Sequence, residues 1–234
     1  MPDHPAKPET AHSQTAHPKI SAAQAPVIAV LTGDLIKSTA ATGGALDHTM
    51  GVLQAAVAEI GSWYPGETAI FQRYRGDGWQ MALSEHTGAL RAALYLLARL
   101  RADKEALGTR IFIGVDQAPD LPGEDLSSAS GAAFVTSGRG LDKLSSLHIL
   151  GIGGAGFGRK DQIILELLEQ HVLKWTREQA EAAVLALHPD RPTLADMGKA
   201  LGISPQAVNY RMHGGAIQVI RDSLDTWENI LQGS

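Results

Sequence analysis

Two aspartates in this chain each stand beside a glycine at the polar end of a stretch that reads as a β-strand. Asp34 ends the apolar run VIAVLTGD, and Asp77 lies in the segment RYRGDGW. Carboxylates that converge on one edge of a sheet can hold divalent cations, and nucleotide phosphates can complete the coordination. Arg73 and Arg75 flank the second aspartate and could pair with a phosphate or a base edge. The alternatives are a turn or cap role for Asp34 and a merely soluble hairpin tip for the two arginines.

The spacing of apolar residues predicts the elements that position these aspartates. We expect a buried strand opening into a loop over 27–39, where Gly33 lets the backbone turn sharply. A hairpin follows, with strands at 68–72 and 79–83 and Asp77 at its tip. Further helices are expected at 46–63, 87–101, from 131 onward and at 163–175, and further strands at 110–115 and 147–152. This order predicts an α+β fold with helices packed on a mostly antiparallel sheet.

Three segments lack such a pattern. Residues 1–26 carry five prolines and few large apolar groups, so we expect a disordered tail. Residues 116–130 read as a long polar loop. Five glycines lie among residues 151–159, which predicts a linker or a tight turn between two domains.

Composition narrows the function classes. The chain has 234 residues and no cysteine, which excludes disulfides and thiolate metal sites. Its formal charge of -5 argues against coating nucleic acid by bulk electrostatics, although a local DNA-reading surface remains allowed. No apolar run reaches the roughly 18 to 20 residues that span a bilayer, and the N-terminus does not resemble a signal peptide. We therefore expect a cytoplasmic protein without a membrane partner.

A second functional pattern lies in the segment TLADMGKALGISPQAVNYRM, residues 193–212. Its apolar residues fit two short helices, and Gly198 and Gly202 permit their close crossing and the turn. The pattern predicts a helix-turn-helix in which Ser204 caps the second helix. The outward polar groups of that recognition helix would be Gln206, Asn209, Tyr210 and Arg211.

Those four residue types suit the base edges and phosphates of double-stranded DNA. The alternatives are an exposed polar face without a partner, or a helix-turn-helix that contacts protein only. Residues 172–234 hold six basic and seven acidic side chains. A dimer could still concentrate the basic side chains on one surface.

The segments GDLIKST and RYRGDGWQM resemble the two metal motifs of class III nucleotidyl cyclases. The stretch from Gly131 to Arg139 resembles a third segment of that family. The resemblance implies a Mg or Mn ion bound with a purine nucleotide. It places metal ligands at Asp34 and Asp77, a backbone carbonyl at Leu35, a phosphate-facing turn at Ser38 and Thr39, base selection at Arg73 and Ser128, and the transition-state arginine at Arg139.

Two departures from the cyclase pattern favour binding over turnover. Lys37 replaces a glycine of the turn, and Val135 replaces an asparagine that orients the ribose. Loss of one positioned donor costs about 2.7 to 4 kcal/mol of transition-state stabilisation. From about Val27 onward, the chain is also similar to the SatD family, which combines a cyclase-like region, a GAAF-like segment and a C-terminal helix-turn-helix.

These observations predict a transcriptional regulator whose cyclase-like domain senses a purine nucleotide and controls a DNA-binding domain. The expected domains are a tail at 1–26, a cyclase-like domain at 27–158, a connecting helix at 159–175 and a helix-turn-helix domain at 176–234. By resemblance we expect a homodimer. The rivals are an active metal-dependent nucleotidyl cyclase or related nucleotide enzyme, and a cyclase-like domain that serves only as a dimerisation scaffold.

Overall fold

The computed structural model describes residues 26–63, 66, 68–74, 76–117, 125–127 and 129–233. The expected disordered tail therefore lies outside the described residues, apart from Pro26. Arg75, Ser128 and most of the first half of the expected loop at 116–130 lie outside them as well.

The N-terminal half is built on a five-stranded sheet with the order β2-β3-β1-β4-β5. The strands are β1 (Val27–Leu35), β2 (Ala69–Arg73), β3 (Gly78–Leu83), β4 (Thr109–Gln117) and β5 (Leu150–Gly154). Neighbours pair in antiparallel fashion except β4 and β5, which are parallel. The central strand β1 pairs with both β3 and β4, so residues at its C-terminal end meet two other strands.

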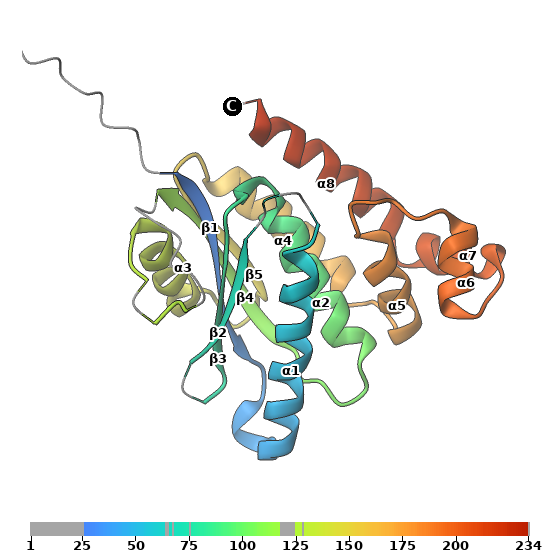
Figure 1. Cartoon of the computed structure of the whole chain (residues 1–234), viewed down its shortest axis with the longest axis horizontal. Coiled ribbons are helices and arrows are strands. Elements are labelled where there is room, and N and C mark those ends of the chain that lie inside the picture. The colour runs from blue at the N-terminus through green and yellow to red at the C-terminus, as the bar shows by residue number, and fades with distance from the viewer. Residues whose placement is uncertain are drawn as a thin grey trace, which may run out of the picture.

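Helices cover both faces of this sheet (Figure 1). On one face lie α1 (Gly43–Ile60) and α2 (Ala89–Ala102), and on the other lies α3 (Ala132–Lys143). Successive side chains of β1 point to opposite faces of the sheet. Ala29 and Leu31 join the core under α1 and α2, while Ile28 and Val30 pack with Ala133 of α3. The helix α4 (Arg159–Val172) follows β5 and leads to the C-terminal helices.

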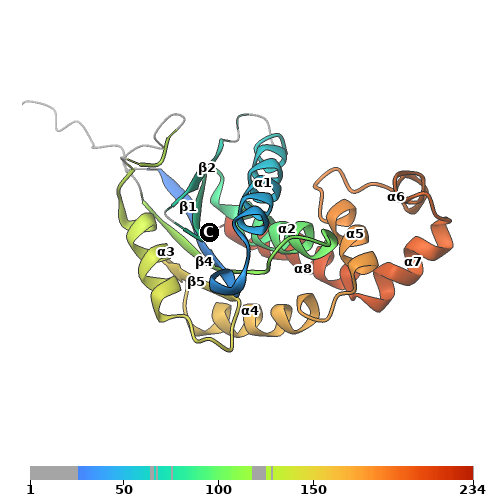
Figure 2. The ribbon, with the colours of Figure 1, turned by 90° about the horizontal axis from the view of Figure 1, so that it is seen from below.

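Four helices complete the chain: α5 (Arg177–Ala186), α6 (Leu194–Leu201), α7 (Pro205–Gly214) and α8 (Ile217–Gln232). In the view of Figure 2, α6 and α7 form the end of the molecule that is far from α3. The helix α5 packs against α2, and α8 contacts α2 through the side chains of Asp225 and Glu228. Buried residues of the sheet, α2, α5, α7 and α8 form one continuous hydrophobic cluster. The C-terminal helices are therefore joined to the sheet through a shared core.

The contact between α2 and α8 contains a buried arginine. Arg91 of α2 is 2 % exposed, and its guanidinium donates to Glu228 at 2.6 and 3.0 Å and to Asp225 at 2.7 Å. Eleven residues of α2 are buried, so the helix is enclosed on most sides rather than on one face as its leucine spacing suggests. A charge in such a place requires partners, and α8 supplies them.

Two expectations about glycines were wrong. Gly33 does not make the turn after β1, because it lies inside the strand, and a Cβ there would stand 2.4 Å from the Trp79 ring. The turn comes at Lys37, which has a left-handed φ of 62°. The first glycines of the segment 151–159 do not form a linker, since β5 includes Gly151 to Gly154, whereas Gly156 lies in a turn, which was the other alternative. A Cβ at Gly151 would stand 2.4 Å from the Phe112 ring, so the glycine makes room for that side chain.

The predicted α+β class is confirmed: a mixed sheet with helices on both faces is followed by an all-helical region. Within the part of the chain that the structure describes, no helix is long and apolar enough to cross a membrane.

Candidate ligand site and recognition helix

The first candidate site lies at the C-terminal end of β1, where Asp34 meets Arg110 of β4. The register of the two strands places these residues opposite each other. Arg110 Nε donates to Asp34 Oδ1 at 2.9 Å, and its Nη2 contacts Oδ2, so the pair is bidentate. Hydrogen bonding to Asp34 raises the pKa of the Arg110 guanidinium above its ordinary value. Both side chains keep about 30 % exposure, which leaves the pair within reach of a ligand.

Asp77 lies beside this pair, at the tip of the β2–β3 hairpin. The Leu35 amide donates to the Asp77 carbonyl at 3.2 Å, which ties the hairpin tip to the end of β1. The Ser38 hydroxyl donates to the Asp77 carboxylate. Ser38 and the exposed Thr39 belong to a 3-10 helix at Ser38–Ala40 that begins just after Lys37. The structure thus brings together the two aspartates and the turn that sequence analysis assigned to one site.

The expected cationic residues are less closely gathered. Arg73 Nη1 donates to Asp47 of α1 at 2.7 Å, and its guanidinium also bonds the Gly76 carbonyl. Arg139 and Val135 lie exposed on α3, on the opposite face of the sheet from α1. Ser128 lies outside the described residues. The assignment of these residues to nucleotide binding stays a prediction.

The donor chemistry of the sheet edge suits a hard divalent cation, since Asp34, Asp77 and the Leu35 carbonyl all offer oxygen. Among the described residues, however, no group of three or more metal-ligating side chains is formed. Asp34 already receives the positive charge of Arg110 on both oxygens, so a cation would have to exchange with that guanidinium. The expected Mg or Mn ion with a nucleotide stays a prediction.

Arg110 was not predicted as a site residue. It appeared only as the first residue of an expected strand, and a charged residue at a strand end is unremarkable. Its role depends on the register of β4 against β1, which single-strand patterns do not determine.

The second candidate site is the helix-turn-helix formed by α6 and α7. Thr193 caps α6 in a capping box with Asp196, and the Ser204 side chain accepts from the Ala207 amide at the start of α7. Gly202 ends α6 in the left-handed conformation, with a φ of 67°. A Cβ at Gly198 would stand 2.7 Å from the Ile203 carbonyl oxygen, so the glycine makes room for the turn between α6 and α7. The predicted segment thus forms two capped helices joined by a short turn, and their assignment to a DNA-reading motif stays a prediction.

One face of α7 is exposed. Val208 and Met212 are buried against the other helices, whereas Gln206, Asn209 and Tyr210 are exposed, Tyr210 to 81 %.

His213 continues this exposed face, because Gln206, Asn209, Tyr210 and His213 follow the i, i+3, i+4, i+7 spacing. Asn209 and His213 also line a hollow of about 400 Å³ together with Arg191 and Arg221. His213 was not predicted as a site residue, although its helical spacing from Gln206 places it on the same exposed face.

Arg211 does not point outward with Gln206, Asn209 and Tyr210, as the sequence had predicted. It follows the buried Val208 by three residues, so it flanks the buried face of α7. Its Nη1 donates to Glu181 of α5 at 3.0 Å and to the Glu178 carbonyl at 3.3 Å. The guanidinium therefore braces α7 against α5, and its assignment to DNA contact stays a prediction.

Comparisons with known proteins give a limited result. No family model matches the chain, and no curated protein matches its sequence. Among solved structures, the chain is similar to the active GGEEF domain of a diguanylate cyclase from Vibrio cholerae. The two share 11 % identity, with 57 % of this chain and 85 % of that chain covered and a TM-score of 0.38. This distant likeness concerns the N-terminal fold and assigns neither a family nor an activity, so membership of the SatD family stays a prediction.

Proposed function

We propose that this protein is a DNA-binding transcriptional regulator whose cyclase-like domain senses a purine nucleotide. The observation that carries the proposal is the capped α6-turn-α7 unit with its exposed face of Gln206, Asn209 and Tyr210. Asn and Gln can pair with adenine in the major groove, and a helix of this length fits that groove.

The charges around α7 are consistent with a DNA-reading surface that acts locally. Arg191 and Arg221 lie beside Asn209 and His213 in the hollow between α7 and α8. Both arginines also pair with acidic side chains of α8, including Asp222. Phosphates can compete for the pair of Arg191 and Asp222, whose side chains are half-exposed, because an exposed ion pair is worth only about 0 to 1 kcal/mol.

DNA binding can be tested with a duplex selected by the protein from a random-sequence pool. Affinity for that duplex, measured by fluorescence anisotropy, should fall by about tenfold or more in Asn209→Ala/Tyr210→Ala, because each good base contact contributes roughly 1 to 3 kcal/mol. Asn229→Ala, an exposed change on α8, is the matched control and should leave affinity unchanged. Failure to enrich any duplex, or equal binding by the double variant, would contradict the proposal.

The nucleotide part of the proposal is supported by the cluster of Asp34, Asp77 and Arg110. A nucleotide that arrives with a divalent cation brings a positive charge for the aspartates and a negative phosphate for Arg110. Opening the Asp34–Arg110 pair then leaves neither partner without a counter-charge. A nucleotide without a cation would instead place its phosphates against two carboxylates.

Thermal unfolding with purine mono-, tri- and cyclic nucleotides, with and without Mg²⁺ or Mn²⁺, tests this sensor. A ligand of the native state should raise the Tm, and we expect the rise to need the cation and to vanish in Asp77→Asn and Arg110→Gln. Asp142→Asn, on the exposed part of α3, is the control. Steady formation of cyclic product that disappears in Asp77→Ala would establish the cyclase rival. A Tm that no nucleotide changes would favour the scaffold rival.

A further inference from the structure

A cavity of about 430 Å³ lies between the sheet and the C-terminal helices, and neither Asp34 nor Asp77 is among the residues that line it. Its walls come from the turn after β1, the end of α2, the loop before β4 and the α4–α5 connection. Cavities that hold small organic ligands usually measure about 300 to 1,000 Å³. The cavity is therefore large enough for a compact ligand, and it touches both halves of the molecule.

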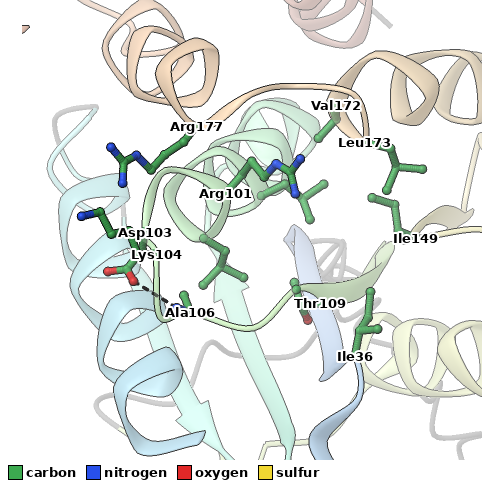
Figure 3. A pocket seen from close by; sticks show the side chains of 13 residues that line it. Ile36, Arg101, Asp103, Lys104, Ala106, Thr109, Ile149, Val172, Leu173 and Arg177 are labelled. Atoms are coloured by element: carbon green, nitrogen blue, oxygen red, sulfur yellow. Dashed lines mark hydrogen bonds between the residues drawn. The ribbon is translucent and has the colours of Figure 1, made fainter. Parts of the chain in front are cut away.

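The two sides of this cavity differ in chemistry. Figure 3 shows Arg177, Lys104 and Asp103 on one side, and Val172, Leu173 and Ile149 on the other. An apolar wall opposite a charged wall suits a molecule with an apolar body and a charged group.

The lining of the cavity has an excess of positive charge, because it includes Arg101, Lys104 and Arg177 but the single carboxylate of Asp103. That carboxylate already accepts hydrogen bonds from the amides of Glu105 and Ala106 and contacts His48 at 3.0 Å. Burial disfavours its ionised form, but these hydrogen bonds outweigh burial and hold the pKa of Asp103 below its ordinary value. The negative charge of Asp103 is thus satisfied locally.

The cations are less well satisfied. Within the described part of the chain, neither Arg101 nor Lys104 forms an ion pair, and both are exposed; Arg101 Nε donates to the Trp175 carbonyl at 2.7 Å. Arg177 Nε is buried without a hydrogen-bond acceptor among those residues, and it lies 3.6 Å from Glu181 Oε1. Buried donors of this kind normally have a partner.

We propose that this cavity binds a small organic anion with a compact apolar body, held by Arg177 and Lys104 at its acidic group. The apolar body rests on the wall of Val172, Leu173 and Ile149. A carboxylate, sulfonate or phosphate group can pair with the exposed part of the Arg177 guanidinium and with the Lys104 ammonium.

Binding of an anion in this cavity would affect the contacts of α7 through one carboxylate that Arg177 and Arg211 share. Glu181 lies 3.6 Å from Arg177 through Oε1 and accepts from Arg211 of α7 at 3.0 Å through Oε2. An anion in the cavity competes with Glu181 for Arg177. Glu181 then pairs with Arg211 only. The effect on DNA rests on the proposed function, whereas ligand binding itself does not.

The test uses anilinonaphthalene sulfonate, a fluorescent aromatic anion, and its uncharged analogue phenylnaphthylamine. Titration of the full chain should show saturable sulfonate binding that weakens by about tenfold in Lys104→Gln/Arg177→Gln, with little change for the uncharged probe. Leu173→Ser should weaken binding of both probes. Glu181→Gln should tighten sulfonate binding, because Arg177 loses its competing carboxylate; a purely structural role of Arg177 would not produce that gain.

The matched control removes two cationic side chains that do not line the cavity. Arg159→Gln/Lys160→Gln lies at the start of α4, near the exposed Ile163 and Ile164. We expect sulfonate binding to be unchanged in this variant, and circular dichroism should show that both double variants remain folded. The proposal is overturned if the wild type shows no saturable binding, if both double variants bind alike, or if only the α4 control loses affinity. These outcomes do not depend on whether the protein binds DNA.

Discussion

Replacing the buried arginine between α2 and α8 should destabilise the whole chain. Arg91→Met keeps much of the apolar length of the side chain and removes the guanidinium. Glu228, whose side chain is 13 % exposed, would then lose a partner in a place where water cannot replace it fully.

The magnitude follows from the exposure of the partners. Breaking a fully buried ion pair by removing one partner costs about 3 to 5 kcal/mol. Asp225 is 30 % exposed and keeps its contact with Arg191, so it recovers part of its solvation or pairing. We therefore expect a loss near the lower end of that range, about 3 kcal/mol in the free energy of unfolding.

Arg99 offers a control on the same helix. It pairs with Glu59 at 2.8 Å, but the two side chains are 30 and 39 % exposed. Arg99→Met should cost only about 1 kcal/mol or less, because exposed pairs are weak and screened. Urea unfolding followed by circular dichroism and tryptophan fluorescence measures both changes.

The triple variant Arg91→Met/Asp225→Leu/Glu228→Leu separates pairing from packing. With no charge left unpaired, it should recover much of the lost stability, as replacement of buried ion networks by apolar residues often does. If Arg91→Met costs no more than Arg99→Met, or if the triple variant is no more stable than the single one, the network does not hold α8 on α2.

Three further predictions concern the sheet, the core and the turn after β1. Gly114→Ala should lower the free energy of unfolding by about 1 to 3 kcal/mol, because its Cβ would stand 2.4 Å from the Ala133 carbonyl oxygen. Gly138→Ala, in open space on a helix, should instead raise the free energy of unfolding by up to about 1 kcal/mol. The urea midpoints of the two variants measure this difference. Burial and the neighbouring Glu59 raise the pKa of the Tyr95 phenol, so the native state resists its ionisation. Stability should be retained below the ordinary tyrosine pKa of about 10 and fall above it, with a shallower fall in Tyr95→Phe when urea unfolding is repeated between pH 9 and 11. Lys37→Gly should raise the free energy of unfolding by up to about 1 kcal/mol, because Lys37 holds a φ of 62° that glycine adopts without strain; an unchanged urea midpoint would contradict this.

The sequence predicted most elements because their patterns are local. Helical spacing predicted the helix at 46–63, which the structure places at Gly43–Ile60, and the Asp-Gly turn predicted the β2–β3 hairpin. Side-chain pairing across elements was not predictable in this way. On α2, Arg91 and Arg99 look alike in the sequence, yet only Arg91 is enclosed, because α5 and α8 return to that part of the helix. The glycines of β5 looked like a linker because the aromatic ring that fills their space comes from Phe112 on another strand.

In the candidate site, too, local features were predictable from the sequence and pairing between strands was not. Strand ends beside glycine predicted that Asp34 and Asp77 would approach each other, and the structure joins them through the Leu35 amide and Ser38. The partner of Asp34 could not be predicted, because Arg110 reaches it only in one register of β4 against β1.

The exposure of these charge pairs decides which contacts a ligand can change. The Asp34–Arg110 and Glu181–Arg177 pairs have side chains about 30 to 40 % exposed, so exchange of one partner costs on the order of 1 kcal/mol. The Arg91 contact costs about 3 kcal/mol to open, which is more than most small-ligand couplings supply. If the two proposed ligand sites are real, a ligand at the sheet edge or in the cavity would therefore leave α8 fixed on α2. The contacts that join the cavity side to α7 include the pair of Arg211 and Glu181 and the bond from Trp175 Nε1 to the Gly215 carbonyl just after α7.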